Sequence, residues 1–447
     1  MNLRERFVHG GIVAVMRGAY AWERLRDGVG FDLLGWSYRE DPYPAYARLR
    51  EIDPVHWSRV VPGWVLSRYD DVVEALGDPR LSADERNWKR YPMIAARRRR
   101  MGVPEPYSDG AASMLRLDAP DHTRLRRLVS RAFTPRAIER MRPRIQAIAD
   151  RLLTRVADHG EIELVRDFSA PLPVIVIAEM LGVPPEDHER FRHWSDEGVR
   201  TLGFGDADDI RRSVAAQEQL RGYLEGIVAA RRREPRDDLV SALVAAEEMG
   251  DRLGSGELFA QIMLILVAGN ETTTNLIGNG LIALLRHPDQ LEILRRDPDR
   301  IPAAIDELVR YDSPVQLTSR MAPFDLEFRG RRVRRGEQLV LLLGAANRDP
   351  SAFPDPDRLD VTRLDVRPLS FGHGVHFCLG AQLARLESEI AFRALLATFA
   401  RIDLARDRIE WGDNTVLRGP RRLDLKVLRR RRAEGSWRRH VASQHLA

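Results

Sequence analysis

The chain has 447 residues, of which 44% are hydrophobic and 31% are charged, an ordinary composition for a folded globular protein. Its formal net charge is only +5, because 71 basic residues are interspersed with 66 acidic ones, and this balance argues against nucleic-acid binding. The single cysteine excludes an internal disulfide framework and fits a reducing compartment, so we expect the protein to be cytoplasmic.

Residues 1–40 form an N-terminal extension. Its apolar core of fewer than about ten residues has arginines on both sides and is too short to span a bilayer, so we expect neither a transmembrane anchor nor a signal peptide. The segment is predicted to be an amphipathic helix that packs on the protein or rests on a membrane surface. Of these two alternatives we favour packing on the protein.

The first half of the remaining chain predicts helices with a small sheet. A helix that begins at about residue 41 precedes two strands, VHWSRV and GWVLSRY, joined by a turn at Pro62 and Gly63, and DDVVEALGD is predicted to be a short helix. Residues 82–113 carry prolines, glycines and arginines with little periodicity, which predicts a long irregular loop. Residues 120–230 have apolar positions three and four apart, as expected of successive helices.

The second half contains the longest predicted helix, residues 256–289, whose first part is apolar nearly all round and therefore belongs in a large core. A helix follows at 301–315, then short strands near 325–333 and 337–349, and a helix from beside Cys378 to about residue 400. A hairpin-like end at 414–427 leads into a basic tail, 429–447. No linker or repeat divides these elements, which favours one mainly helical domain.

The lone cysteine lies in the stretch FGHGVHFCLGAQLAR, residues 371–385. A thiolate is a soft metal ligand, and the N-terminus of the helix that follows would stabilise its charge. Gly372 and Gly374 permit a tight turn that lets the backbone approach a flat ligand. A lone cysteine is also often just a small buried hydrophobe, so this residue alone does not decide the function.

The ten residues FGHGVHFCLG resemble the haem-binding loop of the cytochrome P-450 superfamily, Phe-Gly-x-Gly-x-(His or Arg)-x-Cys-x-Gly. The resemblance implies that residues 41–428 form a single domain with the mainly α cytochrome P-450 fold, a large helical domain with small β-sheets. It also implies that haem b, iron protoporphyrin IX, is the cofactor. Cys378 would be the axial ligand of the haem iron, with Phe371 and Gly380 beside the cofactor.

Two further motifs fall in the family's order. AGNETT, residues 268–273, resembles the kink where dioxygen is activated: dioxygen would bind beside Ala268 and Gly269, and Glu271 and Thr272 would relay protons to it. ELVR resembles the family's structural Glu-x-x-Arg pair. The resemblance assigns fold stability to a trio of side chains: Glu307, Arg310 and Arg358.

The carboxylates of a porphyrin need cations or hydrogen-bond donors. His122 and Arg126 are four residues apart and therefore share one helix face. By resemblance they meet the haem propionates, together with Arg320 and with His376 in the cysteine loop.

The resemblance also outlines the substrate pocket and the reaction. The pocket would include residues 82–113 and 199–204, a strand at 315–318, and these side chains: Leu264, Ile265, Ala268, Gln316, Leu317, Thr318, Thr415 and Val416. They are mostly apolar, which suits a terpenoid, fatty acid, steroid or polyketide. The implied enzyme is a monooxygenase of secondary metabolism that hydroxylates or epoxidises such a molecule with dioxygen.

Electrons must come from separate proteins, because the sequence contains no fused flavin or iron–sulfur domain. A ferredoxin and a ferredoxin reductase are expected, and a small acidic ferredoxin would suit the arginines near the cysteine loop: Arg124, Arg127, Arg131 and Arg385. Two other functions share the haem loop. One is a peroxide-driven peroxygenase, which typically lacks the acid–threonine pair, and the other is a non-enzymatic haem-thiolate sensor or carrier.

Overall fold

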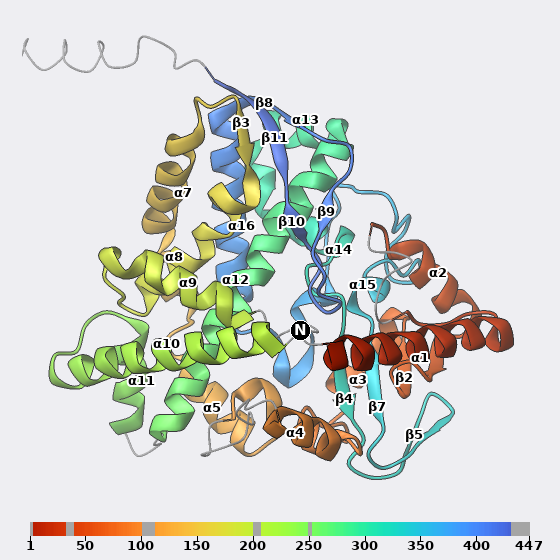
Figure 1. Ribbon diagram of the computed structural model, residues 1–447. Coiled ribbons are helices and arrows are strands. Elements are labelled where there is room, and N and C mark those ends of the chain that lie inside the picture. Colours follow the sequence, from red (N-terminus) through yellow and green to blue (C-terminus); the bar gives the residue numbers. More distant parts are fainter. Residues whose placement is uncertain (1–2, 33–39, 101–111, 200–206, 249–252, 431–447) are drawn as a thin grey trace, which may run out of the picture.

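The computed structural model describes residues 3–32, 40–100, 112–199, 207–248 and 253–430. The outline is triangular, and helices make up most of it (Figure 1). The described helices are α1 (Leu3–Asp27), α2 (Tyr43–Ile52), α3 (Tyr69–Gly77), α4 (Tyr91–Arg100), α5 (Asp121–Ser130), α6 (Pro135–Glu139), α7 (Arg142–Val156), α8 (Pro171–Met180), α9 (His188–Val199), α10 (Ala207–Arg233), α11 (Leu239–Glu248), α12 (Ser255–Arg286), α13 (Pro288–Arg296), α14 (Ile301–Tyr311), α15 (Leu343–Ala346) and α16 (Ala381–Thr398). The strands are β1 (Val55–Ser58), β2 (Gly63–Leu66), β3 (Glu161–Glu163), β4 (Thr318–Met321), β5 (Leu326–Phe328), β6 (Arg331–Val333), β7 (Gln338–Leu341), β8 (Phe399–Leu404), β9 (Glu410–Trp411), β10 (Pro420–Arg422) and β11 (Asp424–Arg429).

Helix α12 runs through the centre of the molecule, as its apolar sequence predicts (Figure 1). Its first turn is capped by Glu257, whose carboxylate accepts the backbone N–H of Gly254 at 2.8 Å. It ends at Arg286, just before Pro288 begins α13. Helices α8, α14 and α16 pack around it.

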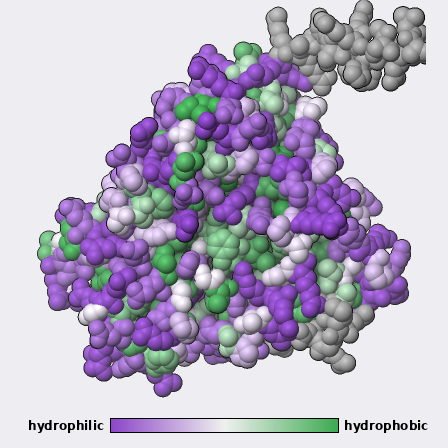
Figure 2. Space-filling view, turned by 180° about the vertical axis from the view of Figure 1, so that it is seen from behind, coloured by the Kyte–Doolittle hydropathy of each residue, from purple (hydrophilic) through white to green (hydrophobic). Residues whose placement is uncertain are grey.

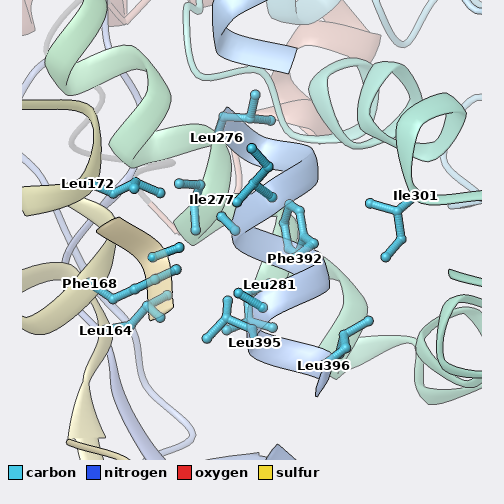
Figure 3. Close-up of a cluster of buried hydrophobic side chains, with 14 of the residues drawn as sticks. Leu164, Phe168, Leu172, Leu276, Ile277, Leu281, Ile301, Phe392, Leu395 and Leu396 are labelled. Carbon is cyan, nitrogen blue, oxygen red and sulfur yellow. The ribbon is translucent and has the colours of Figure 1, made fainter. Parts of the chain in front are cut away.

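The largest hydrophobic core surrounds the C-terminal half of α12. In this core, α12 contributes Leu276, Ile277 and Leu281, which pack with Phe392 and Leu395 of α16 (Figure 3). The opposite side of the cluster is formed by Leu164, Phe168 and Leu172. Gly280 allows this close packing, since a Cβ there would lie 2.8 Å from the ring of Phe392. The core therefore fixes the spacing between α12 and α16.

The main sheet has the strand order β1-β2-β7-β4. Strands β1 and β2 form the predicted antiparallel hairpin, and β2 pairs in parallel with β7, whose other edge is covered by antiparallel β4. A second sheet has the order β3-β11-β8, and two smaller pairs join β9 with β10 and β5 with β6.

The predicted irregular loop at 82–113 is wrong in part, because it contains helix α4. Pro92 lies in the first turn of α4, where a proline is tolerated, and residues 93–100 contain neither proline nor glycine. Alanine and arginine are strong helix formers, so the arginine run extends the helix although it lacks apolar periodicity. Residues 101–111 of the predicted loop lie outside the described residues.

Two strand predictions also need correction. The C-terminal stretch does not fold back on itself: β10 pairs with β9, whereas β11 pairs with β3 and β8. The strand expected at 315–318 begins only at Thr318, and Val315 makes an isolated bridge with Leu417. The pairing of β11 with β3 and the bridge from Val315 to Leu417 join segments that are remote in the sequence, and local alternation of residues does not identify such partners.

Helix α1 is attached to the body through one buried carboxylate. Glu23 is fully buried and accepts hydrogen bonds from the Ser58 hydroxyl, from His56 and from the backbone N–H groups of Arg59 and Val60. The segment is therefore attached to the protein through Glu23, near the C-terminal end of α1. Within the described residues, no helix is long and apolar enough to cross a membrane.

The face opposite to that of Figure 1 is largely hydrophilic, and hydrophobic residues gather toward its middle (Figure 2).

Candidate active site

Cys378 lies at the end of a tightly folded loop that leads into α16. Its backbone N–H donates to the carbonyl of Phe371 at 2.8 Å, which closes the loop. Gly372 and Gly374 have φ values of 74° and 69°, a region that favours glycine. A Cβ on Gly374 would lie 3.0 Å from the carbonyl oxygen of Leu76, so this glycine also lets the loop approach α3 closely.

The thiol has few protein atoms to stabilise its charge. Burial raises the pKa of Cys378, while a hydrogen bond from the backbone N–H of Gly380 and the charges of Arg126 and Arg385 lower it in part. The residue nevertheless keeps exposed surface, and a Cβ on Gly380 would meet nothing within 4 Å. A thiol that is surrounded by protein and still has an open side fits a ligand that binds on that side.

A cluster of two histidines and two arginines lies beside this loop. The rings of His122 and His376 are 4.0 Å apart, and Arg126 donates to the carbonyl of Phe377 at 2.6 Å. Burial and the neighbouring His122, Arg320 and Arg126 lower the pKa of His376 to about 3. The buried Nε2 of His122 has no hydrogen-bond partner among the described residues.

Such a cluster fits an anion. Arg320 is buried, its pKa is lowered by that burial, and Asp118 is the carboxylate that partly offsets it. Carboxylates bound here would pair with Arg126 and Arg320, and one of them would accept a hydrogen bond from the Nε2 of His122. The structure therefore brings together all four side chains that the sequence suggested for the propionates of a haem.

The residues of the AGNETT motif form a continuous part of α12, without the interruption that the resemblance implied. The segment is packed closely against its neighbours: a Cβ on Gly269 would lie 2.7 Å from Ile177 of α8, and Thr274, which directly follows the motif, donates to the carbonyl of Ser169 at 3.1 Å. In contrast, Ala268 is exposed although it lies in the middle of a buried helix. The side of the helix that carries Ala268 therefore faces open space.

Glu271 and Thr272 are partly accessible on this helix. Burial alone raises the pKa of Glu271 to about 7, so its carboxyl exchanges a proton near neutral pH. The hydroxyl of Thr272 donates to the carbonyl of Ala268 at 2.6 Å, which leaves its oxygen free to accept a further hydrogen bond. An acid poised near neutrality next to a hydroxyl can donate a proton to a bound group.

The Glu-x-x-Arg pair is present, but its predicted third member is wrong. Arg310 donates to both oxygens of Glu307, at 2.7 and 2.8 Å, and both side chains are fully buried. Arg358 contributes only its backbone carbonyl, while its side chain is exposed. The ion pair to Glu307 comes from Arg363 at 3.3 Å, because the irregular chain between 355 and 363 turns that side chain inward.

Most of the predicted pocket side chains are partly accessible. They come from α12, from the 315–318 segment and from the 415–416 turn. The 315–318 segment is joined to the 415–416 turn by a hydrogen bond from the backbone N–H of Gln316 to the carbonyl of Val416 at 2.8 Å. The side chain of Gln316 itself is buried, donates to the carbonyl of Ser313 at 2.7 Å and packs against Gly344. Its predicted role as an orienting group in the pocket is therefore not supported. The partly accessible or exposed set is Leu264, Ile265, Ala268, Leu317, Thr318, Thr415 and Val416.

The other two predicted pocket segments are only partly visible. Residues 101–111 and 200–206 lie outside the described residues, so the pocket expectations for them stay predictions.

Sequence reasoning missed three polar residues near the site. Asn270 donates to Ser195 of α9, and Arg363 completes the buried ion pair. Glu387 of α16 is fully buried beside Thr273, and burial raises its pKa to about 8. A glutamate among apolar positions of a helix was a signal that could have found Glu387, whereas Arg363 lies in a loop that carries no periodicity.

Cys378 offers one soft sulfur ligand, and Arg126 and Arg320 beside it can bind carboxylates. This combination suits an iron porphyrin and places the molecule in the class of haem-thiolate proteins. The chain belongs to the cytochrome P-450 family, whose profile matches residues 207–427. A haem cofactor follows from that membership, and the family's dependence on redox partners and hydrophobic substrates applies. The protein is an oxidoreductase that acts as a monooxygenase.

Known proteins resemble it over almost its whole length. It is 44% identical over 402 residues to the Vitamin D(3) 25-hydroxylase of Pseudonocardia autotrophica, and the matched region covers 89% of this chain and 96% of the relative. The solved bacillaene polyketide synthase cytochrome P-450 of Bacillus subtilis has a TM-score of 0.81 and 39% identity, covering 89% and 99%. A myxobacterial cytochrome P-450 in complex with myristic acid has a TM-score of 0.79 and 43% identity, with the same coverage. The predicted fold is therefore confirmed.

Proposed function

We propose that the protein binds haem b through the thiolate of Cys378 and oxidises a large hydrophobic molecule at a C–H or C=C bond. The observation that carries this proposal is the cluster of His122, Arg126, Arg320 and His376 beside the Cys378 loop, in which the buried Nε2 of His122 has no hydrogen-bond partner among the described residues. His122, Arg126, Arg320 and His376 would hold the propionates. The haem, when bound, supplies the activation of dioxygen and the transfer of one oxygen atom to the substrate.

The chain's own residues would control protons at the face of α12 that carries Ala268. Glu271, with a pKa of about 7, would hold a proton at neutral pH, and the oxygen of Thr272 would accept a hydrogen bond that keeps the proton path in place. Ala268 would leave room for dioxygen, because it is exposed on α12 and its side chain is only a methyl group, whereas Gly269 lets Ile177 of α8 pack closely against the same turn.

The cofactor assignment is tested by Cys378→Ser, compared with the wild type and with Val375→Ala as a control in the same loop. The wild type and the control are expected to give the thiolate-type Soret band in a carbon-monoxide difference spectrum, and Cys378→Ser is expected to lose it. Persistence of that band in Cys378→Ser would contradict the assignment.

For the substrate we propose a long or polycyclic apolar molecule, with a fatty acid or a polyketide first among the candidates. The accessible apolar side chains of α12 and of the 415–416 turn support this class, and the relatives named above act on or bind a vitamin D, a polyketide or myristic acid. Thr318 and Thr415 would orient its polar groups.

The substrate class is tested by titrating the ferric protein with myristic acid, a macrolide aglycone and a sterol. At least one of them is expected to give a saturable blue shift of the Soret band. If none of these compounds shifts the band, an apolar pocket is the wrong interpretation.

We further propose that a ferredoxin and its reductase deliver the electrons in the cytoplasm. The arginines expected to receive a ferredoxin are not equivalent, since Arg124 pairs with Glu257 and Arg385 pairs with Asp306 at 2.9 Å. Arg131 is exposed and would carry more of the attraction. Arg131→Glu should slow reduction by an acidic ferredoxin, whereas Arg401→Glu in distant β8 should not. Reduction that ignores both Arg131→Glu and ionic strength would contradict this docking site.

The proposed domain limits are those suggested by the sequence: a domain over 41–428, an N-terminal extension over 1–40 and a tail over 429–447. The 402-residue match to a shorter relative supports them. Within this scheme the extension is seated on the domain by Glu23, and Arg429 still belongs to β11.

A peroxygenase or a haem-thiolate sensor would use the same haem loop. Both are separated from a monooxygenase by measuring product formed with a redox partner and NADPH against product formed with hydrogen peroxide alone. We expect the first to exceed the second, because Glu271 and Thr272 would serve only the electron-driven route.

A further inference from the structure

Asn270 joins the acid-bearing turn of α12 to a different helix. Its side-chain Nδ2 donates to the hydroxyl oxygen of Ser195 on α9 at 3.0 Å, and the two residues are only 4% and 1% exposed. A hydrogen bond between two side chains this deeply buried has a defined geometry, because water does not compete for either group. Asn270 directly precedes Glu271, so the bond acts on the turn that carries the acid.

Helix α9 is in turn bound to α10. Trp194, the neighbour of Ser195, donates its indole N–H to Gln219 of α10 at 2.9 Å and lies 5.3 Å from the ring of Tyr223. The two helices therefore form one unit, and in Figure 1 this unit lies beside α8 and α12. A shift of the unit would reach α12 through the hydrogen bond between Ser195 and Asn270.

The other contacts of this turn lead to elements other than α9. Gly269 packs on Ile177 of α8, and Thr274 donates to the carbonyl of Ser169 in the segment before α8. Thr273 is hydrogen-bonded to Glu387 of α16. Among the described residues around Glu271, Asn270 is thus the side chain that is hydrogen-bonded to α9.

We propose that Asn270 is a positioning residue that couples the seating of α9 on α12 to the orientation of Glu271 and Thr272. This inference rests on the proton role proposed above for those two residues. When the bond is formed, the turn is held and the carboxyl of Glu271 keeps the orientation from which it donates its proton. When the bond is broken, that orientation is lost, and dioxygen that has taken up two electrons from the redox partner and two protons leaves as hydrogen peroxide.

The test compares Asn270→Ala, Ser195→Ala and the double variant in the haem-loaded protein. Ser195→Thr retains a hydroxyl as a conservative variant. Thr274→Val is the matched control, since it also removes one buried hydrogen bond of α12 but leaves α9 alone. Two quantities are measured: hydrogen–deuterium exchange of α9, and the fraction of NADPH electrons recovered as hydrogen peroxide with a surrogate ferredoxin, its reductase and myristic acid as the probe.

Asn270→Ala and Ser195→Ala are each expected to raise both quantities about two- to tenfold, the effect of losing one buried hydrogen bond. The double variant should match the single variants, because both remove the same interaction. Ser195→Thr should behave as the wild type, and Thr274→Val should lower the thermal midpoint without changing either quantity.

The coupling is wrong if Asn270→Ala changes exchange in α9 no more than Thr274→Val does, or if the effects of the single variants add. Faster exchange in α9 with an unchanged peroxide fraction also overturns it, because the acid is then oriented without the bond. Failure of the proposed function is recognised separately, by the absence of the thiolate-type Soret band in the wild type.

Discussion

Glu271 has a pKa that burial raises to about 7, so its proton occupancy changes within the range in which a cell works. Product formation in the wild type is expected to fall as the pH rises through about 7, since the carboxyl then loses the proton that it donates. Glu271→Gln should remove this step and lower product formation about a hundredfold, the usual effect of losing a general acid. The measurement is product per minute against pH, and Glu271→Asp, which retains an acid, serves as the control. A variant Glu271→Gln with the wild-type pH profile would exclude this role.

Glu387 is a second buried carboxyl, and its pKa of about 8 links stability to pH. The folded chain keeps this proton up to about pH 8, whereas the unfolded chain loses it near the ordinary value of 4.5. Stability is therefore expected to fall as the pH rises between these values, by up to about 1 kcal/mol per pH unit. Glu387→Gln should flatten this dependence in urea unfolding, because it is neutral at every pH. Equal slopes for both proteins would mean that Glu387 is ionised in the fold.

At the scale of elements, the buried pair of Glu307 and Arg310 joins α14 to the irregular segment that precedes the cysteine loop. Arg310 also donates to the carbonyls of Asn347 and Pro356, so one guanidinium holds three parts of the chain. Glu307→Gln is expected to lower the free energy of unfolding by about 3 kcal/mol, because it leaves a buried cation unpaired.

Arg363 and Arg358 take different parts in this network, so their substitutions should differ in their effect on stability. Arg363→Ala should destabilise the protein by about 1 kcal/mol, since it removes an ion pair to a buried carboxylate. Arg358→Ala should stay within about 0.5 kcal/mol of the wild type, because its side chain is exposed and only its backbone carbonyl is used. Urea unfolding of the two variants measures this difference, and a larger effect of Arg358→Ala would reverse the assignment.

At the scale of the whole molecule, α1 is held by a pH-dependent contact. Burial opposes protonation of His56, but its hydrogen bonds with Asp53 and Glu23 raise its pKa to about 9. The pKa of Glu23 is lowered, since hydrogen bonds from His56 and the N–H of Arg59 outweigh its burial. The contribution of His56 to folding stability is complete below about pH 6.5 and is lost as the pH rises through about 9. The contribution of Glu23, whose pKa is lowered, is lost in acid.

Hydrogen–deuterium exchange in α1 tests this attachment. Exchange is expected to be slow near neutral pH and to increase above about pH 9, and Glu23→Gln should increase it at every pH, by about tenfold or more. Arg24→Gln, an exposed neighbour on the same helix, is the control and should leave exchange unchanged. If Glu23→Gln and Arg24→Gln behave alike, the helix is held by other contacts.

The sequence by itself determined most of the long helices and the cofactor class, and it supplied the candidates for the residues nearest the chemistry. Helix α12 and the hairpin β1-β2 follow from local periodicity, and Cys378 follows from a motif whose glycines have a local conformational reason. The four candidates for binding the propionates, and Glu271, could also be proposed from the sequence, because each lies in a short stretch that resembles the family.

Only the tertiary structure decided contacts between segments remote in the sequence. Arg363, and not Arg358, forms the ion pair with Glu307, and the side chain of Gln316 is buried outside the predicted pocket. The C-terminal strands belong to two different sheets, and Asn270 is hydrogen-bonded to Ser195. Side-chain direction in loops, strand partners and buried hydrogen bonds depend on how the whole chain packs, and no local pattern encodes them. The pKa of about 7 for Glu271 has the same origin, because the burial that raises it comes from elements far from it in the chain.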